Sequence, residues 1–211
     1  MQKGPIKNPE EMKKKILVSA AKNFAKKGYA GTSLKDIALT AKISKGGLYH
    51  HFSNKEDLFF AVCTENVNTA MTKTLAFFEK KQIIQQCKED TLLEDLEEYY
   101  DNVVIGTKDF ERLWIAGIIE SNHNNKLKKM LLKIDKDAEV WGLQTLKQIR
   151  DTSNLLKGYS DLELYDIMHG FSALYKGIIV ERLIGKTPEE IKKAWIQTIY
   201  AIYNSKNNLK H

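Results

Sequence analysis

Apolar residues recur at intervals of three and four along several segments of this chain, which is the spacing of amphipathic helices. In the first segment, Asn8 is a predicted N-cap, Pro9 takes the first helical position and Glu11 the third. Gly28 follows the last apolar position and predicts a left-handed helix stop. One apolar face lies between these signals and comprises Ile16, Leu17, Ala20, Ala21, Phe24 and Ala25.

Two short helices are predicted next, joined by a tight turn. Ser33 caps the first of them, with Asp36 at its third position. Lys42-Ile43 makes the turn, and Ser44 caps a very short helix that ends near residue 52. The stripe that the first of these helices turns toward the core comprises Leu34, Ile37, Ala38 and Ala41.

The rest of the chain is predicted to be a helical bundle. Ser53 and Glu56 form a capping box that opens a fourth helix, which runs to about residue 81. Asp109, Ser160 and Thr187 are further candidate caps. The later helices are predicted near 91–106, 109–122, 124–151, 161–184 and 188–205, so the fold class is all-α, with about nine helices.

The short third helix has two different sides when its residues are placed at 100° intervals. Leu48 and Phe52 share the side that faces the core. The opposite side carries Gly46, Gly47, Tyr49 and His50, with Lys45 and His51 at the flanks. Each glycine costs about 1 kcal/mol relative to Ala in a helix. Close approach of the helix backbone to another surface would explain that cost.

Exposed Tyr and His beside the glycines can hydrogen-bond to phosphates and base edges, so this helix is a candidate for reading DNA. The alternative is a capped linker helix with a glycine hinge. Charge favours DNA: residues 1–60 carry 12 Lys+Arg and 5 Asp+Glu, whereas residues 61–211 carry 21 and 22. The basic excess is therefore confined to one segment, which favours a polyanionic partner.

The last two predicted helices are apolar on more than one side, which indicates burial on two faces. One face can meet the bundle, and a second copy of the chain is the simplest partner for the other. A larger intramolecular core is the alternative. The residues predicted at the homodimer interface are Phe171, Leu174, Ile178, Trp195, Ile199 and Ile202.

Other classes of protein find little support. The chain has no run of 18 or more apolar residues, and its N-terminal stretch has no apolar signal-peptide core, so we expect a cytoplasmic, nucleoid-associated protein with no membrane partner. Cys63 and Cys87 are isolated, and no histidine has a metal-ligand partner at three or four residues. Phosphate-loop, Rossmann and nucleophile-elbow motifs are absent, so we expect no enzyme activity, cofactor or metal.

The segment from Ile16 to Val62 resembles the DNA-binding domain of TetR-type (tetracycline-repressor-like) regulators. The matching positions are Phe24, Gly28, Thr32, Ile37, Ala38, Ala41, Ser44, Gly46, Leu48, Tyr49, Phe52, Lys55 and Leu58. The resemblance implies a helix-turn-helix DNA-binding domain in residues 1–54. It also implies a regulatory and dimerisation domain in residues 55–211, where the chain matches the family only in helical character and length.

The resemblance also implies roles for single residues. Thr32 or Ser33 would bind a phosphate at the start of the second helix. Lys45, Gly46, Gly47, Tyr49 and His50 would lie in or along the major groove, and His51 and Lys55 would bind the DNA backbone. The family commonly has Gly where this chain has Lys42. A left-handed backbone there costs a non-glycine residue about 1–2 kcal/mol, and we hypothesise that Lys42 adds a phosphate contact.

The middle helices would supply a pocket for an unknown small-molecule effector. Its candidate residues are Tyr99, Tyr100, Trp114, Glu120, Trp141, Phe171 and Tyr175. Aromatic residues at helical spacing can equally be plain core. The expected function is a homodimeric repressor that binds a palindromic double-stranded operator and is released by the effector. The alternative is an all-helical ligand- or protein-binding module that no longer binds DNA.

Overall fold

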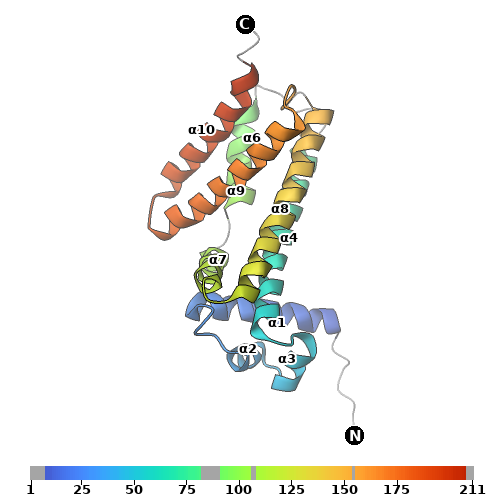
Figure 1. Ribbon diagram of the computed structural model, residues 1–211, viewed down its shortest axis with the longest axis vertical. Helices are drawn as coiled ribbons and strands as arrows, with labels where there is room; N and C mark the ends of the chain where they lie inside the picture. The colour runs from blue at the N-terminus through green and yellow to red at the C-terminus, as the bar shows by residue number, and fades with distance from the viewer. Residues whose placement is uncertain (1–7, 82–90, 106–107, 154, 208–211) are drawn as a thin grey trace. The chain divides into compact units, whose positions relative to one another are not determined.

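The computed structural model describes residues 8–81, 91–105, 108–153 and 155–207, and every regular element in these ranges is helical (Figure 1). The predicted all-α class is therefore confirmed. None of the described helices is long and apolar enough to cross a membrane. The helices are α1 (Pro9–Lys27), α2 (Leu34–Ala41), α3 (Lys45–His51), α4 (Lys55–Lys81), α6 (Leu92–Tyr99), α7 (Lys108–Ser121), α8 (Asn125–Thr152), α9 (Asp161–Leu183) and α10 (Pro188–Asn207), with a π-helical turn at Tyr100–Val104.

Most helices begin where the capping signals predicted. Asn8 accepts a hydrogen bond from the Glu10 N–H at the start of α1, and Pro9 takes the first helical position. Full capping boxes open α2 and α9, and Thr187 and Glu190 exchange the same pair of bonds at α10. These local bonds satisfy N–H groups that the helix itself leaves unpaired.

The start of α4 lies one residue later than the predicted capping box. Asn54, rather than Ser53, accepts the bond from the backbone N–H of the third helical residue, and that residue is Asp57 rather than Glu56 (2.9 Å). The Asn54 amide also donates to the Asp57 carboxylate at 2.8 Å. This shift leaves the Glu56 carboxylate available for other partners.

Three other predicted features differ in detail. Gly28 does end α1 with a positive φ of 71°, but its ψ of 174° is extended rather than left-handed helical. The helix expected over 91–106 changes after Tyr99 into the π-turn, where the Ile105 N–H bonds to the Tyr100 carbonyl. Asp109 lies in the first turn of α7 instead of at its cap.

The chain packs as two compact units. Unit 1 comprises Met1–Val67 and Thr107–Ile134, and unit 2 comprises Asn68–Gly106 and Asp135–His211. These packing units do not follow the functional boundary expected at residues 54 and 55, which stays a prediction.

In unit 1, α2 packs on α1 and α3 packs on α2. An aromatic trio of Phe24, Tyr29 and Phe59 fills the centre, with ring centroids 5.1–5.8 Å apart. A Cβ added to Gly117 of α7 would come within 2.6 Å of the Phe59 ring, so α7 approaches α4 closely. Unit 1 thus joins the first helices to the segment that contains α7 and the start of α8.

Unit 2 contains two adjoining apolar clusters. One gathers Tyr100, Val104, Ile178, Ile191, Trp195 and Ile196, and the other gathers Phe77, Leu92, Ile149 and Leu155. Tyr99 joins them, because its ring contacts Phe77, Phe78 and Trp195. Its hydroxyl lies 3.2 Å from the Thr74 hydroxyl, and burial raises the pKa of Tyr99.

Candidate nucleic-acid interface

The short helix α3 is oriented by its two apolar residues. Leu48 is fully buried and Phe52 is 6% exposed, whereas Tyr49 and His50 are exposed. Ser44 caps the helix by accepting a bond from the Gly47 N–H at 3.0 Å. The predicted division of α3 into a buried and an outward side is confirmed.

The outward side of α3 carries the predicted glycine pair. A Cβ added to Gly46 would meet no atom within 4 Å, and one added to Gly47 would meet only the Ser44 hydroxyl, at 3.3 Å. Gly46 is therefore not required by packing within the chain. Because Gly46 has no side chain, another molecule can approach the α3 backbone closely at this position.

The side chains around the glycines contact one another. The Lys45 ammonium lies 5.7 Å from the centre of the Tyr49 ring, and the His50 and His51 rings meet edge to face at 5.5 Å. Lys45, Tyr49 and His50 are exposed, and His51 is half-buried. These groups offer a cation, a phenol and imidazole nitrogens along one surface, which suits contacts to phosphates and base edges.

Lys42 keeps the left-handed turn that usually favours glycine. Its φ and ψ are 54° and 47°, and it is exposed. The turn is closed by the Lys42 N–H to the Leu39 carbonyl (3.1 Å) and the Ile43 N–H to the Ala38 carbonyl (3.0 Å). The lysine therefore accepts backbone strain at this position, next to the outward side of α3 in the sequence.

Thr32 does not lie at the surface, contrary to the phosphate-binding role considered for it. The residue is 2% exposed. Its hydroxyl donates to the carbonyls of Gly28 (2.8 Å) and Asn23 (3.1 Å), so it closes the end of α1. The buried Thr32 hydroxyl is therefore used in bonds within the chain.

Ser33 is exposed, but its hydroxyl and N–H both bond to the Asp36 carboxylate, at 2.7 Å and 3.1 Å. These two bonds, with the Lys27 ammonium at 3.2 Å, lower the pKa of Asp36 to about 2. The first turn of α2 therefore already holds an anion. A phosphate at this helix would have to use other groups, such as a neighbouring lysine.

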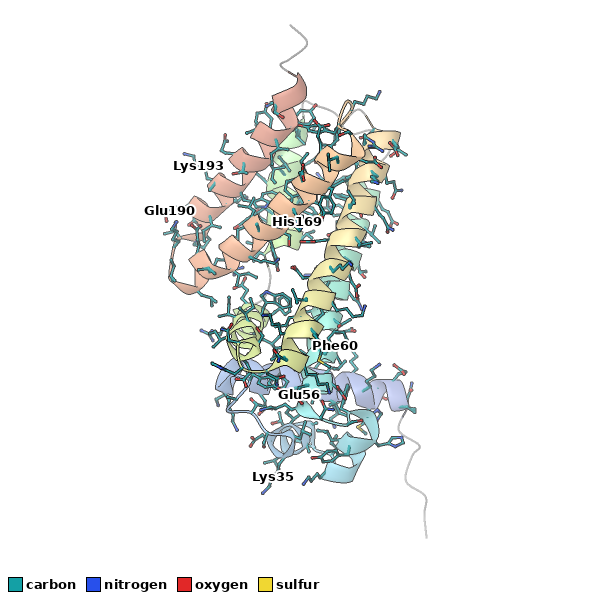
Figure 2. All side chains as sticks on the ribbon, viewed as in Figure 1. Lys35, Glu56, Phe60, His169, Glu190 and Lys193 are labelled. Carbon is teal, nitrogen blue, oxygen red and sulfur yellow. The ribbon has the colours of Figure 1, made fainter. Side chains whose placement is uncertain are left out.

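Lys35 is that neighbour, and the sequence reasoning missed it. It is exposed on α2, and its side chain points away from the body of the helix (Figure 2). Lys35 and Lys42 are seven residues apart, near the two ends of α2, and both are exposed. That spacing was visible in the sequence and could have identified Lys35 as a second candidate cation.

Lys55 has a partner within unit 1. Its ammonium donates to the Tyr29 carbonyl at 2.9 Å and lies 4.3 Å from the centre of the Tyr29 ring. The residue is half-buried. The resemblance implied that Lys55 binds the DNA backbone, but within the chain its ammonium is already held by this carbonyl and ring.

The predicted effector residues are divided between the units. Trp114 and Glu120 belong to unit 1, and the other five belong to unit 2. Tyr100 and Trp114 are buried. In the unit 2 core, the Tyr99 ring stacks on Trp195 and the Tyr100 ring meets Trp195 at a tilted angle of 51°, so both tyrosines pack in that core. Trp141, Phe171 and Tyr175 are half-buried in unit 2.

Unit 2 also has an open, largely apolar groove of about 650 Å³. None of the predicted effector residues lines it. Its lining residues come from α9, α10 and the preceding loop, and are Tyr159, Ile167, Gln197, Thr198, Ala201, Ile202 and Ser205.

Four of the six residues predicted at the dimer interface belong to the unit 2 core or pack against it. Ile178 and Trp195 are buried in the unit 2 core, and Leu174 and Ile199 pack against that core. Phe171 and Ile202 are half-buried. The interface prediction was therefore wrong for Ile178 and Trp195, because the unit's own core uses these bulky side chains.

The opposite side of α9 is exposed along its whole length. It carries large apolar residues at its ends, Leu162 (71% exposed) and Ile184 (72%), and Val180 (47%) between them. Small residues fill the middle, and a Cβ added to Gly170 or Gly177 would meet nothing within 4 Å. This surface, the α9 outer face, comprises Leu162, Asp166, His169, Gly170, Ala173, Gly177, Val180 and Ile184.

The first helices match a family of known proteins in sequence. Residues 16–62 match the family model of bacterial regulatory proteins of the tetR family. YerO, an HTH-type transcriptional regulator of Bacillus subtilis, is 40% identical over 63 residues, which are 30% of this chain and 22% of YerO. IcaR of Staphylococcus epidermidis, the HTH-type negative transcriptional regulator of the biofilm operon icaADBC, is 46% identical over 48 residues, 23% of this chain and 26% of IcaR. These alignments span about a quarter of each relative's length.

Solved structures match the fold over nearly the whole chain. GusR of Salmonella enterica superposes with a TM-score of 0.68 at 18% identity, covering 95% of this chain and 100% of GusR. A transcriptional regulator from Saccharomonospora viridis, solved in complex with choline, superposes with a TM-score of 0.63 at 18% identity, covering 90% of this chain and 96% of the other. At such identities the likeness concerns the fold.

Proposed function

We propose that this chain, which belongs to the tetR family of bacterial regulatory proteins, is a DNA-binding transcriptional regulator. The outward side of α3 carries the proposal. Gly46 has open space around it, and exposed Lys45, Tyr49 and His50 surround it. In a helix-turn-helix, the second helix enters the major groove and the first crosses the backbone. In this chain α3 would read base edges, while Lys35 and Lys42 would contact phosphates.

The test is selection of bound duplexes from a random pool, followed by titration of the selected sequence at several salt concentrations. We expect a preferred sequence and a logarithmic salt slope of about −0.9 for each phosphate neutralised. The variant Tyr49→Ala should lose sequence preference, because base contacts specify while phosphate contacts position. No binding by the unaltered protein at low salt would refute the proposal.

We further propose that the regulator acts as a homodimer on a palindromic operator. The support is the α9 outer face. Its glycines cost about 1 kcal/mol each relative to Ala, and no contact among the described residues requires them. Small residues allow two helices to approach closely. The open groove lined by residues of α9, α10 and Tyr159 could receive a partner's side chain. Two copies of α3 about 34–36 Å apart, or a multiple of that distance, would match successive major grooves.

Repression and release by a small effector complete the proposal. IcaR is a negative regulator by name, and the Saccharomonospora viridis protein was solved with choline. A ligand would act through unequal affinity for two states of the dimer, a coupling of about 1–3 kcal/mol. Loss of operator binding on addition of a candidate small molecule, measured at constant salt, tests this step.

A further inference from the structure

The N-terminal ends of α4 and α8 are bonded to each other in unit 1. Asn124 is the N-cap of α8, where its Oδ1 accepts from the Leu127 N–H at 3.0 Å. The Nδ2 of the same side chain donates to Oε1 of Glu56, in the first turn of α4, at 3.2 Å. One amide therefore caps one helix and binds the start of another.

Lys126 makes the second connection. Its ammonium donates to Oδ1 of Asp57 at 2.9 Å and to Oδ1 of Asn54 at 3.3 Å, and these two residues form the cap of α4. A cation in the first turn of a helix is disfavoured by the helix dipole. The two acceptors on α4 account for a lysine at this place in α8. We call the five residues Asn54, Glu56, Asp57, Asn124 and Lys126 the α4–α8 latch.

Glu56 is poised to hold the latch as an anion. Burial raises the pKa of its carboxyl group, but the pKa is lowered overall by its own backbone N–H, the Tyr29 hydroxyl, the Asn124 amide and the Lys126 charge. A carboxylate is therefore present at neutral pH and accepts the Asn124 bond as a charge-assisted one. Figure 2 shows Glu56 at the end of α4 that begins beside α1.

The latch lies next to α3 in the chain. Only Phe52 and Ser53 separate α3, which ends at His51, from Asn54. Phe52 is buried, so this connection is short and tethered at both ends. Between the latch residues Asn54 and Glu56, Lys55 donates to the Tyr29 carbonyl. Of the first three residues of α4, Lys55 thus binds the Tyr29 carbonyl, while Glu56 and Asp57 bind the start of α8. Together these bonds fix the point at which the chain passes from α3 into α4.

We propose that Asn124 and Lys126 are positioning residues for DNA reading, which hold α3 in its binding orientation through the first turn of α4. The proposal rests on the DNA-binding function proposed above. Neither residue lies on α3 or α2, so each would act on affinity without itself contacting a phosphate. The start of α8 would then control how well α3 fits the major groove of DNA.

The variant Asn124→Asp tests the bond to Glu56 without removing the N-cap of α8. Asp caps helices as well as Asn does, so α8 should form normally. The new carboxylate would face Glu56 and repel it. We expect operator affinity to fall roughly tenfold, the size of one lost bond to a charged group. The salt slope should not change, because no phosphate contact is lost.

Charge removal on the other partner should restore the latch. In Glu56→Gln/Asn124→Asp, the glutamine amide can donate to the aspartate, so affinity should return to near the original value. Lys126→Ala should weaken binding only about twofold, since this pair is exposed and exposed pairs contribute little. Lys128→Ala, an exposed lysine two residues further on, is the matched control and should bind as the unaltered protein does.

Amide hydrogen exchange of the free protein provides a readout that does not need DNA. Exchange in α3 should accelerate in Asn124→Asp and slow again in the double variant. Unchanged α3 exchange, an affinity that stays at the original value, or a salt slope that falls with the affinity would each overturn the latch. If the unaltered protein binds no DNA while α3 exchange responds as expected, the proposed function fails and the latch stands.

Discussion

At the scale of single residues, Lys42 offers the sharpest test, because its backbone and its charge have opposite effects. Its left-handed conformation costs a non-glycine residue about 1–2 kcal/mol. Lys42→Gly should therefore raise the free energy of unfolding by about 1 kcal/mol, after allowing for the extra entropy of glycine in the unfolded chain. Removal of the charge should weaken DNA binding and make the logarithmic salt slope shallower by about 0.9.

Two measurements separate these effects, namely urea unfolding and DNA titration over a range of salt. Lys42→Ala is the matched control, since it removes the charge but keeps the strained backbone. It should lose the same salt slope without gaining stability. If the slope is the same in all three proteins, Lys42 makes no phosphate contact.

The roles of some site residues could be predicted from the sequence, and the roles of others could not. The outward side of α3 was predictable because Leu48 and Phe52 fix the helix rotation, and the helical period then places Tyr49 and His50. Thr32 and Lys55 were not, because each is decided by how the chain folds back on itself: Thr32 bonds to Asn23 and Gly28 at the end of α1, and Lys55 bonds to Tyr29, 26 residues away. Such tertiary bonds leave no local signal.

At the scale of elements, helix starts were the most predictable feature, because a cap and its partner lie within four residues of each other. The capping boxes at Ser33, Ser160 and Thr187 form as expected. The start of α4 was misplaced by one residue, since Ser53-Glu56 and Asn54-Asp57 are both plausible pairs in sequence. In the structure Asn54 is the N-cap of α4, so the Glu56 carboxylate accepts a hydrogen bond from Asn124 instead.

The capping box of α2 makes stability depend on pH in a defined window. The folded-state pKa of Asp36 is lowered to about 2, below the value of about 3.9 for an unfolded aspartate. Its contribution is therefore fully present above about pH 4 and is lost as the pH falls toward about 2. Asp36→Asn should be less stable than the original protein at pH 6, and this difference should shrink between pH 4 and pH 2.

Urea midpoints of both proteins at pH 6, 4, 3 and 2 measure that difference. Other carboxylates contribute equally to both proteins and cancel. Asp109→Asn, an exposed aspartate in the first turn of α7, is the control for a generic loss of charge at a helix N-terminus. A difference between Asp36→Asn and the original protein that stays constant down to pH 2 would exclude the capping carboxylate as its source.

At the scale of the whole molecule, the all-α class was predictable and the assignment of faces in the C-terminal helices was only partly so. The sequence showed that α9 and α10 are apolar on several sides. It did not show which side the unit's own core would take. Bulky Ile178 and Trp195 fill that core together with the distant Tyr100, whereas the middle of the α9 outer face carries the small residues Gly170, Ala173 and Gly177. Large apolar side chains stabilise the fold most where the chain's own packing removes the most apolar surface from water.

The α9 outer face leads to a prediction about assembly. Ala173 lies at the middle of this face and is exposed. Arg is a good helix former, so Ala173→Arg should keep α9 intact. It would place an unpaired charge at the surface where we propose that two copies of the chain meet. We expect the original protein to sediment as a dimer at micromolar concentration and Ala173→Arg as a monomer.

Leu132→Arg is the matched control, because Leu132 is also exposed but lies on α8. It should stay dimeric. The monomeric variant should also lose most of its affinity for a palindrome while keeping weak binding to a half-site, since two linked half-site contacts reinforce each other. Its melting temperature should depend less on protein concentration than that of the dimer. A dimer that survives Ala173→Arg with unchanged stability would place the interface elsewhere, and close helix approach would then no longer account for Gly170 and Gly177.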